Sequence, residues 1–233
     1  MRKAAVLTFC LFCFPALEGC IFDNRHAGTS TSVTNPVGMV TGFAILRDGT
    51  PAAGARVIIR VPTVSVDSTG APQCMLMSDT VADSAGRYTV PLVYLKDAYM
   101  EIREAPGQRP GRPADSLEIL LRRWPNGLPH DGKMGTFRLA TAGDVTGRFP
   151  QADTAKTAKR WIGVRGTANF IKEPNTSPFL LKGVPAGVRE LMEVEVPDAG
   201  GAGRPAAVKD TIGLGVVHSG VSADFGPIYY YTD

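Results

Sequence analysis

The sequence has few of the side chains from which catalytic and metal sites are built. Only three of its 233 residues are histidines, and none has the His-x-His or Glu-x-x-His spacing that would present two ligands to one metal ion. The Gly-x-Ser-x-Gly pattern, which presents the nucleophile of many serine hydrolases, does not occur. The sequence therefore predicts no catalytic residues, no metal site, no cofactor and no enzymatic activity.

A strong net charge is also absent. The chain has 25 lysines and arginines against 22 aspartates and glutamates, a formal net charge of +3. Removing residues 1–19 leaves 23 basic and 21 acidic residues. So small a charge gives no electrostatic basis for binding a polyanion, so nucleic acid is not a predicted partner.

Cysteines and long hydrophobic runs are scarce. Cys10 and Cys13 lie in the apolar run Ala4–Ala16, and beyond Cys20 only Cys74 remains, so we expect no disulfide within the body of the protein. Because Cys74 lies in an apolar stretch, a buried thiol is favoured over a reactive one. The run at the start is too short to span a bilayer, and no later segment approaches the length that spanning needs.

The first twenty residues are ordered like a secretory signal peptide. Arg2 and Lys3 precede the apolar run, and Leu17-Glu18-Gly19-Cys20 follows it. This order resembles the lipobox of bacterial lipoproteins, in which the cysteine becomes the lipidated first residue. The resemblance implies a signal peptide over residues 1–19 and a membrane anchor through lipid on Cys20. Ile21 stands where an aspartate retains many enteric lipoproteins at the inner membrane, so we expect the outer membrane of a Gram-negative bacterium.

The remaining sequence is typical of an all-β protein. Residues 20–36 are rich in Ser, Thr, Asn and Gly without an apolar period, which predicts a flexible tether after the lipidated cysteine. From Val37 onward, short β-branched and aromatic runs alternate with turn formers, and no segment has a clean helical period. The 26 glycines and 18 prolines also interrupt helices.

Two matches share one offset and indicate an internal repeat. Val40-Thr41-Gly42 recurs as Val145-Thr146-Gly147, and residues 56–60 fall on residues 161–165, both at an offset of 105 residues. The offset is an ordinary domain length. We therefore expect two tandem β-sandwich domains, the first over residues 37–138 and a more divergent second over residues 139–233.

The turns of the first repeat carry a family resemblance. Asp48-Gly49-Thr50-Pro51, then Gly54-Ala55-Arg56-Val57, then Asp83-Ser84-Ala85-Gly86-Arg87-Tyr88 follow one another. Gly49 and Gly86 are suited to positive φ, Asp83 to bonding backbone amides, and Tyr88 to the core. This combination resembles the carboxypeptidase regulatory-like family. It implies a prealbumin-like, seven-stranded sandwich and no catalytic residues, since these modules are usually accessory domains.

Several acidic residues allow two interpretations. Asp67, Asp79 and Asp83 could converge on calcium, but the ligand-dense Asp-x-Asp-x-Asp-Gly pattern is absent, so we expect them to cap hairpins. Glu193 and Glu195 alternate on one strand and are expected to share its solvated face.

The aromatic residues are the better candidates for a binding site. Trp124 follows two arginines, and the chain closes on Tyr229, Tyr230 and Tyr231. Large amphipathic rings stack on sugars or anchor protein contacts, so these four are the predicted ligand-binding residues. Trp161, at the start of a strand, is assigned to the core.

We therefore expect a lipid-anchored, non-enzymatic module of the cell envelope that binds a polysaccharide or an envelope protein. An accessory role beside an envelope hydrolase is a second interpretation. A hydrolase with its site between the two modules is a third.

Overall fold

The computed structural model describes residues 38–91, 96–105, 107, 117–129, 132–148, 159–172, 178–196 and 207–227. Residues 38–233 form one compact unit. The predicted signal peptide, the lipidated Cys20 and the tether lie outside the described residues, as do His26, His130 and Tyr229–Tyr231.

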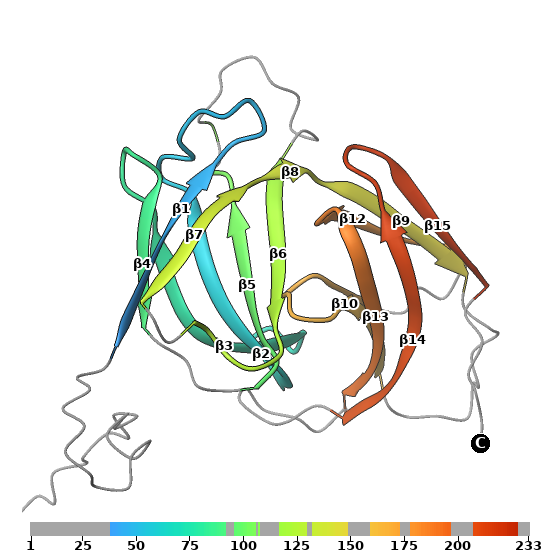
Figure 1. Ribbon diagram of the computed structural model, residues 1–233. Helices are drawn as coiled ribbons and strands as arrows, with labels where there is room; N and C mark the ends of the chain where they lie inside the picture. The colour runs from blue at the N-terminus through green and yellow to red at the C-terminus, as the bar shows by residue number, and fades with distance from the viewer. Residues whose placement is uncertain are drawn as a thin grey trace, which may run out of the picture. The chain divides into compact units, whose positions relative to one another are not determined.

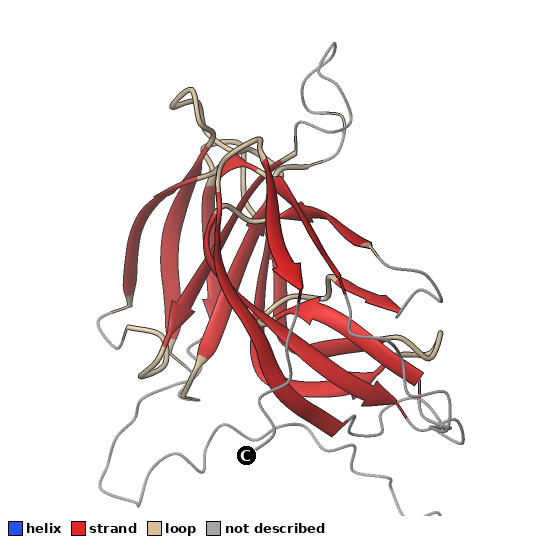
Figure 2. Ribbon diagram, turned by 90° about the vertical axis from the view of Figure 1, so that its right-hand side faces the viewer, coloured by secondary structure: helices blue, strands red, loops and turns tan. Residues whose placement is uncertain are grey.

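Every regular element of the described chain is a β-strand (Figures 1 and 2). The first eight are β1 (Met39–Ile45), β2 (Arg56–Val66), β3 (Pro72–Val81), β4 (Arg87–Pro91), β5 (Ala98–Arg103), β6 (Glu118–Trp124), β7 (Lys133–Arg138) and β8 (Ala140–Thr141). The others are β9 (Gly143–Arg148), β10 (Lys159–Val164), β11 (Phe170–Lys172), β12 (Phe179–Val184), β13 (Gly187–Val196), β14 (Ala207–Val217) and β15 (Ser222–Pro227). Among the described residues, no helix is long and apolar enough to cross a membrane.

Four sheets make two sandwiches with one strand order. In the first sandwich the sheet β4-β1-β7 faces the sheet β3-β2-β5-β6-β8, and in the second β12-β9-β15 faces β11-β10-β13-β14. β1 pairs antiparallel with β4 and parallel with β7, and β9 pairs in the same two ways with β12 and β15. Seven strands thus recur in the same arrangement, and the predicted all-β fold of tandem sandwiches is confirmed.

The offset of 105 residues has a structural meaning. Val40, Val57 and Ile59 lie in the core of the first sandwich, and Val145, Ile162 and Val164 lie in the core of the second. Each residue of the first set precedes its counterpart by that offset. Because side chains alternate between the two faces of a strand, a repeat in register keeps the same positions inward.

The chain passes between the sandwiches at residues 139–142. Leu139 is buried in the core of the first sandwich, and β8 extends the first sandwich's larger sheet by pairing with β6. The Ala142 amide donates to Leu117 O, and β9 begins at Gly143. Residues 139–141 therefore belong to the first sandwich.

The predicted turn chemistry is confirmed in the first sandwich. Gly49 and Gly86 have φ of 89° and 73°. The Asp83 carboxylate accepts from the amides of Ala85 and Arg87, both at 2.9 Å. Tyr88 is 2% exposed, and burial raises the pKa of its phenol well above the usual range. Together these contacts fix the entry into β4.

A buried apolar interface joins the two sandwiches. Val64, Val66 and Cys74 of the first sandwich's larger sheet pack with Met192, Val194 and Val196 of β13 in one buried cluster. Tyr99 and Leu121, also on the outer face of that sheet, are buried with the core of the second sandwich. These parts of the sheet's outer face are covered, so the two sandwiches pack against each other.

The turn of the second sandwich that contains Gly166 and Thr167 packs against this interface. The Gly166 amide donates to the Cys74 thiol at 3.3 Å, and the Cys74 amide donates to Thr167 O at 3.2 Å. Gly166 has a φ of 83°, and a Cβ added there would lie 2.2 Å from the Tyr99 ring. The turn can approach the sheet this closely because position 166 has no side chain.

Replacing Gly166 with alanine should loosen this contact. Strain of the left-handed backbone and the clash with Tyr99 should together lower the free energy of unfolding by about 2 to 4 kcal/mol. Cys74 is the only thiol of residues 21–233, so its reaction with a thiol reagent reports opening of the interface. We expect the reaction to be at least about tenfold faster in Gly166→Ala.

Gly49→Ala is the matched control, because Gly49 also has positive φ but nothing lies within 4 Å of an added Cβ. Equal labelling rates in the two variants would show that the turn does not hold the sandwiches together.

Candidate functional site

Trp124 is part of the packing of the first sandwich. Its half-buried indole lies against the core and meets Phe137 edge to face, with ring centroids 6.3 Å apart. The Arg122 guanidinium lies 5.4 Å from the ring centroid. A binding role for Trp124 stays a prediction, and Tyr229, Tyr230 and Tyr231 lie outside the described residues. Trp161 packs against the interface cluster, as predicted.

The aspartates named as calcium candidates have separate structural roles. Asp67 accepts from the amides of Thr69 and Ala71, and Asp83 caps its own turn. Asp79 differs from the capping prediction, because its two carboxylate oxygens share the single Nε–H of Arg56, at 2.9 and 3.0 Å. Within the described part of the chain, no three His, Cys, Asp or Glu side chains gather where they could hold a metal ion.

The expected solvated face of Glu193 and Glu195 is wrong for Glu193. Glu193 is 3% exposed, and Arg160 Nε donates to its carboxylate at 2.7 Å. Both faces of β13 are covered, since Leu191 packs into the second core and Met192 into the interface. A strand covered on both faces leaves no solvated side for an alternating glutamate.

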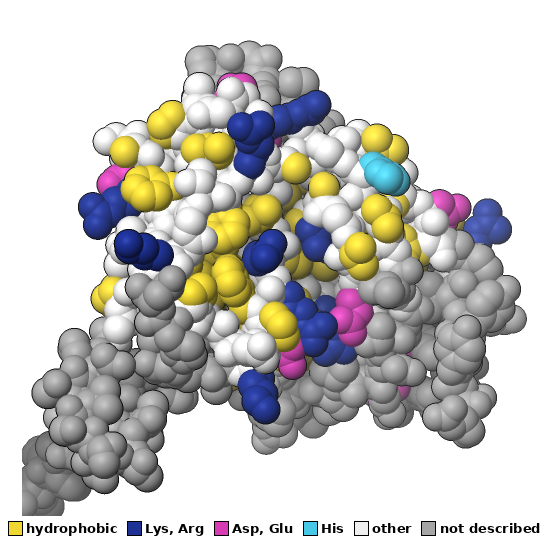
Figure 3. Space-filling model, in the orientation of Figure 1, with side chains coloured by type: hydrophobic (Ala, Val, Ile, Leu, Met, Phe, Trp, Pro, Cys, Tyr) yellow, Lys and Arg dark blue, Asp and Glu magenta, His cyan; other side chains and the backbone are white. Residues whose placement is uncertain are grey.

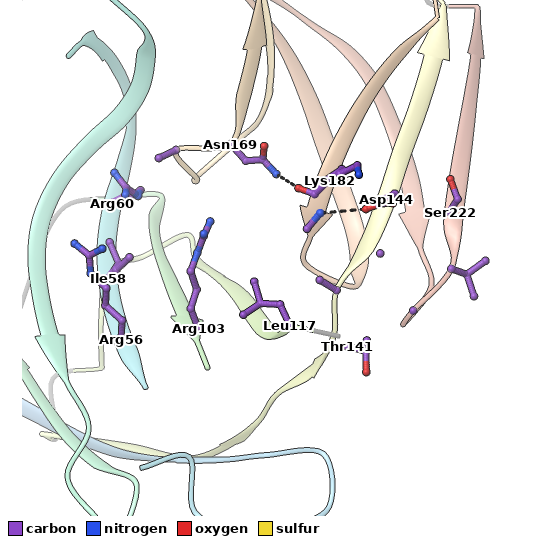
Figure 4. Close-up of a pocket in the computed structure, with 16 residues that line it drawn as sticks. Arg56, Ile58, Arg60, Arg103, Leu117, Thr141, Asp144, Asn169, Lys182 and Ser222 are labelled. Atoms are coloured by element: carbon purple, nitrogen blue, oxygen red, sulfur yellow. Dashed lines mark hydrogen bonds between the residues drawn. The ribbon is translucent and has the colours of Figure 1, made fainter. Parts of the chain in front are cut away.

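A hollow lies between the two sandwiches (Figure 4). It has a volume of about 760 Å³. Its lining comes from both sandwiches and from the chain between them: Arg56, Ile58, Arg60, Arg103, Leu117, Thr141, Asp144, Asn169, Lys182 and Ser222, with glycines and alanines between them. We call this hollow the inter-sandwich cleft.

Three arginines form one wall of the cleft. Arg56 and Arg60 are four residues apart and lie on the same face of β2, and Arg103 is the cross-strand neighbour of Arg56 on β5. Register and alternation therefore place all three guanidinium groups on the outer face of one sheet.

A buried carboxylate holds part of this wall. Glu101 is 0% exposed, and Arg103 Nε donates to its Oε1. Arg60 Nε lies 3.9 Å from the other oxygen, and the Arg60 side chain is 8% exposed. Burial lowers the pKa of Arg60, which nearby Glu101 partly offsets. One glutamate thus holds Arg103 by a hydrogen bond and lies within ion-pair distance of Arg60.

The second sandwich forms the opposite wall. The Asn169 amide group donates to Lys182 O at 2.8 Å, which orients the Asn169 side chain beside Lys182 (Figure 4). The Gly183 amide donates to the Asp144 carboxylate at 3.2 Å. Lys182 is exposed at the cleft. The cleft therefore presents donors from both walls and one carboxylate that already accepts a backbone hydrogen bond.

Cys74 lies buried behind the arginine wall. Arg60 Nη1 donates to Cys74 O at 2.9 Å, and burial raises the pKa of the Cys74 thiol. A raised thiol pKa lowers the thiolate fraction and hence reactivity. The predicted buried thiol is confirmed. His218 is exposed in the turn after β14 and does not line the cleft.

The spacing of two arginines in the sequence could have predicted part of this cleft wall. Arginines at positions 56 and 60, with Ile58 between them, share one face of any strand that contains them. Their partner Arg103 and the opposite wall come from elsewhere in the chain, so only the fold assembles the cleft. On the face seen in Figure 3, lysines and arginines are scattered among hydrophobic side chains rather than gathered into one basic surface.

Comparison with known proteins gives remote structural likenesses and no family. No family model matches the chain, and no curated protein matches it. Solved structures with some likeness include a streptococcal ancillary pilin, at 11% identity over 83% of this chain and 63% of that one, with a TM-score of 0.26. Others are the shaft pilin SpaA of Lactobacillus rhamnosus GG (14%, 83% and 98%, 0.24) and the minor pilin GBS52 of Streptococcus agalactiae (8%, 83% and 98%, 0.30). At these TM-scores the likeness carries no argument about function.

Proposed function

We propose that this chain is a non-enzymatic binding module of the cell envelope, anchored by lipid on Cys20, that holds its partner in the inter-sandwich cleft. The observation that carries the proposal is a cleft lined by hydrogen-bond donors from both sandwiches. The buried interface fixes these donors relative to one another. A preorganised set of donors lowers the cost of binding. The partner is a polysaccharide or a protein of the envelope, and the expected location is the outer membrane of a Gram-negative bacterium.

The described lining favours binding over hydrolysis. Asp144 is its one acidic residue, and that carboxylate accepts from the Gly183 amide. Acid–base cleavage of a glycosidic bond uses two carboxyl groups that flank the bond. An accessory role beside a separate hydrolase remains compatible with a cleft that only binds.

Binding without turnover is tested with the soluble form, residues 21–233, which keeps the whole compact unit of residues 38–233. We expect saturable retention on polysaccharide or protein fractions of the envelope, with the retained ligand recovered unchanged in size. Cleavage of the ligand would contradict the proposal, and so would failure to be retained by any fraction.

The anchor is tested separately. Metabolic labelling with a fatty acid should tag the wild-type chain, because lipid is expected on Cys20, and should not tag Cys20→Ala. Label on Cys20→Ala would place the lipid elsewhere and overturn the anchoring part of the proposal.

A further inference from the structure

We propose that the inter-sandwich cleft binds a carboxylate-bearing glycan, with uronic acid units as the recognised chemistry. This inference rests on the proposed binding function and names the ligand class of the same cleft. It is carried by the charges on the two walls, by one buried arginine and by the polar lining between them.

The cleft has a small positive excess. Arg56, Arg60, Arg103 and Lys182 line it, together with Asp144. Asp79 accepts from Arg56, and Glu101 lies against Arg60 and Arg103. Four cations thus face three carboxylates, which leaves about one positive charge for a ligand. An excess this small suits one carboxylate at a time rather than a densely charged phosphate polymer.

Arg60 shows that this wall is incompletely satisfied from within the protein. Its side chain is 8% exposed, yet its Nε has no hydrogen-bond partner in the described structure. A buried donor without a hydrogen bond costs free energy, and the facing Glu101 Oε2, 3.9 Å away, is likewise without one. Because guanidinium groups present paired N–H donors, they match the planar geometry of a carboxylate.

The remaining lining suits a sugar better than a peptide. Thr141, Ser222 and Asn169 offer hydroxyl and amide groups that both donate and accept. Recognition of an extended peptide uses side-chain pockets or an open sheet edge, whereas Ile58, Leu117 and Val221 are the only large apolar side chains among the described lining residues. The volume of about 760 Å³ lies in the usual range for a small-molecule or oligosaccharide site.

Lys182 is the residue to change, because it is exposed and its substitution leaves the buried pairs of the other wall intact. Lys172 on β11 is the matched control, since it is also an exposed lysine of the second sandwich but does not line the cleft. Lys182→Glu and Lys172→Glu change the net charge equally. Any difference in ligand affinity between the two variants therefore reflects the cleft and not the overall charge.

The experiment is calorimetric titration of residues 21–233 with an oligogalacturonate, and with a neutral galactose oligomer of the same length. We expect saturable binding of the oligogalacturonate with a Kd below about 1 mM. Lys182→Glu should weaken it at least about tenfold, Lys172→Glu less than about twofold, and the neutral oligomer should bind at least about tenfold more weakly.

Each other result overturns the inference in a distinguishable way. Equal weakening by Lys182→Glu and Lys172→Glu would show unspecific attraction. Equal binding of the neutral oligomer would remove the carboxylate from recognition, and tighter binding of an oligoglutamate would move the site to acidic peptides. Retention on envelope fractions without any binding of oligogalacturonate would reject the uronate and leave the proposed binding function standing.

Discussion

Gly86→Ala should lower the free energy of unfolding by about 3 to 5 kcal/mol, a large loss for one added methyl group. Gly86 is buried with a φ of 73°, and an added Cβ would lie 2.3 Å from Ala44 O. That oxygen already accepts from the Ala52 amide at 2.9 Å. The variant therefore combines left-handed strain, a clash with backbone that cannot rotate away, and the weakening of a buried hydrogen bond.

Gly70→Ala is the control for this prediction. Gly70 has a φ of 83°, but nothing lies within 4 Å of an added Cβ. Gly70→Ala should lower the free energy of unfolding by the backbone strain alone, about 1 to 2 kcal/mol. Urea unfolding followed by tryptophan fluorescence measures both variants. Equal losses would mean that the close approach of Gly86 to β1 contributes nothing to stability.

Glu101→Leu should lower the free energy of unfolding by about 3 to 5 kcal/mol. The carboxylate is completely buried between Arg60 and Arg103, and the Arg60 side chain is itself buried. Removing the one anion leaves a buried guanidinium without a counter-charge, and that cost exceeds what the added leucine contributes by apolar burial.

The double variant Arg60→Met with Glu101→Leu separates the cost of the unpaired Arg60 charge from the gain by apolar burial of the leucine. Because it removes both buried charges, it should be more stable than Glu101→Leu alone, and a double-mutant cycle should give a coupling of at least about 1 kcal/mol. The exposed pair Arg123 and Asp97 is the control, and Asp97→Asn should cost less than about 1 kcal/mol. Additive losses at Arg60 and Glu101 would show that the two residues are energetically independent.

The sequence alone determined the local structure of this protein. Asp48, Gly49, Asp83 and Gly86 mark turns through backbone preferences that are properties of a few adjacent residues. Alternating apolar residues mark strands for the same reason. The offset of 105 residues, a property of the sequence, therefore matches buried positions of one sandwich to buried positions of the other.

Only the tertiary structure decided which faces are covered. Alternation shows that Glu193 and Glu195 share a face, but not that this face is buried. It likewise cannot show that Cys74 meets Gly166 across the interface, or that Arg103 and Lys182 border one cleft. These contacts join residues far apart in the chain, and their free energy depends on the docking of two sandwiches. No local pattern encodes that docking, so the cleft is a property of the packing of the two sandwiches.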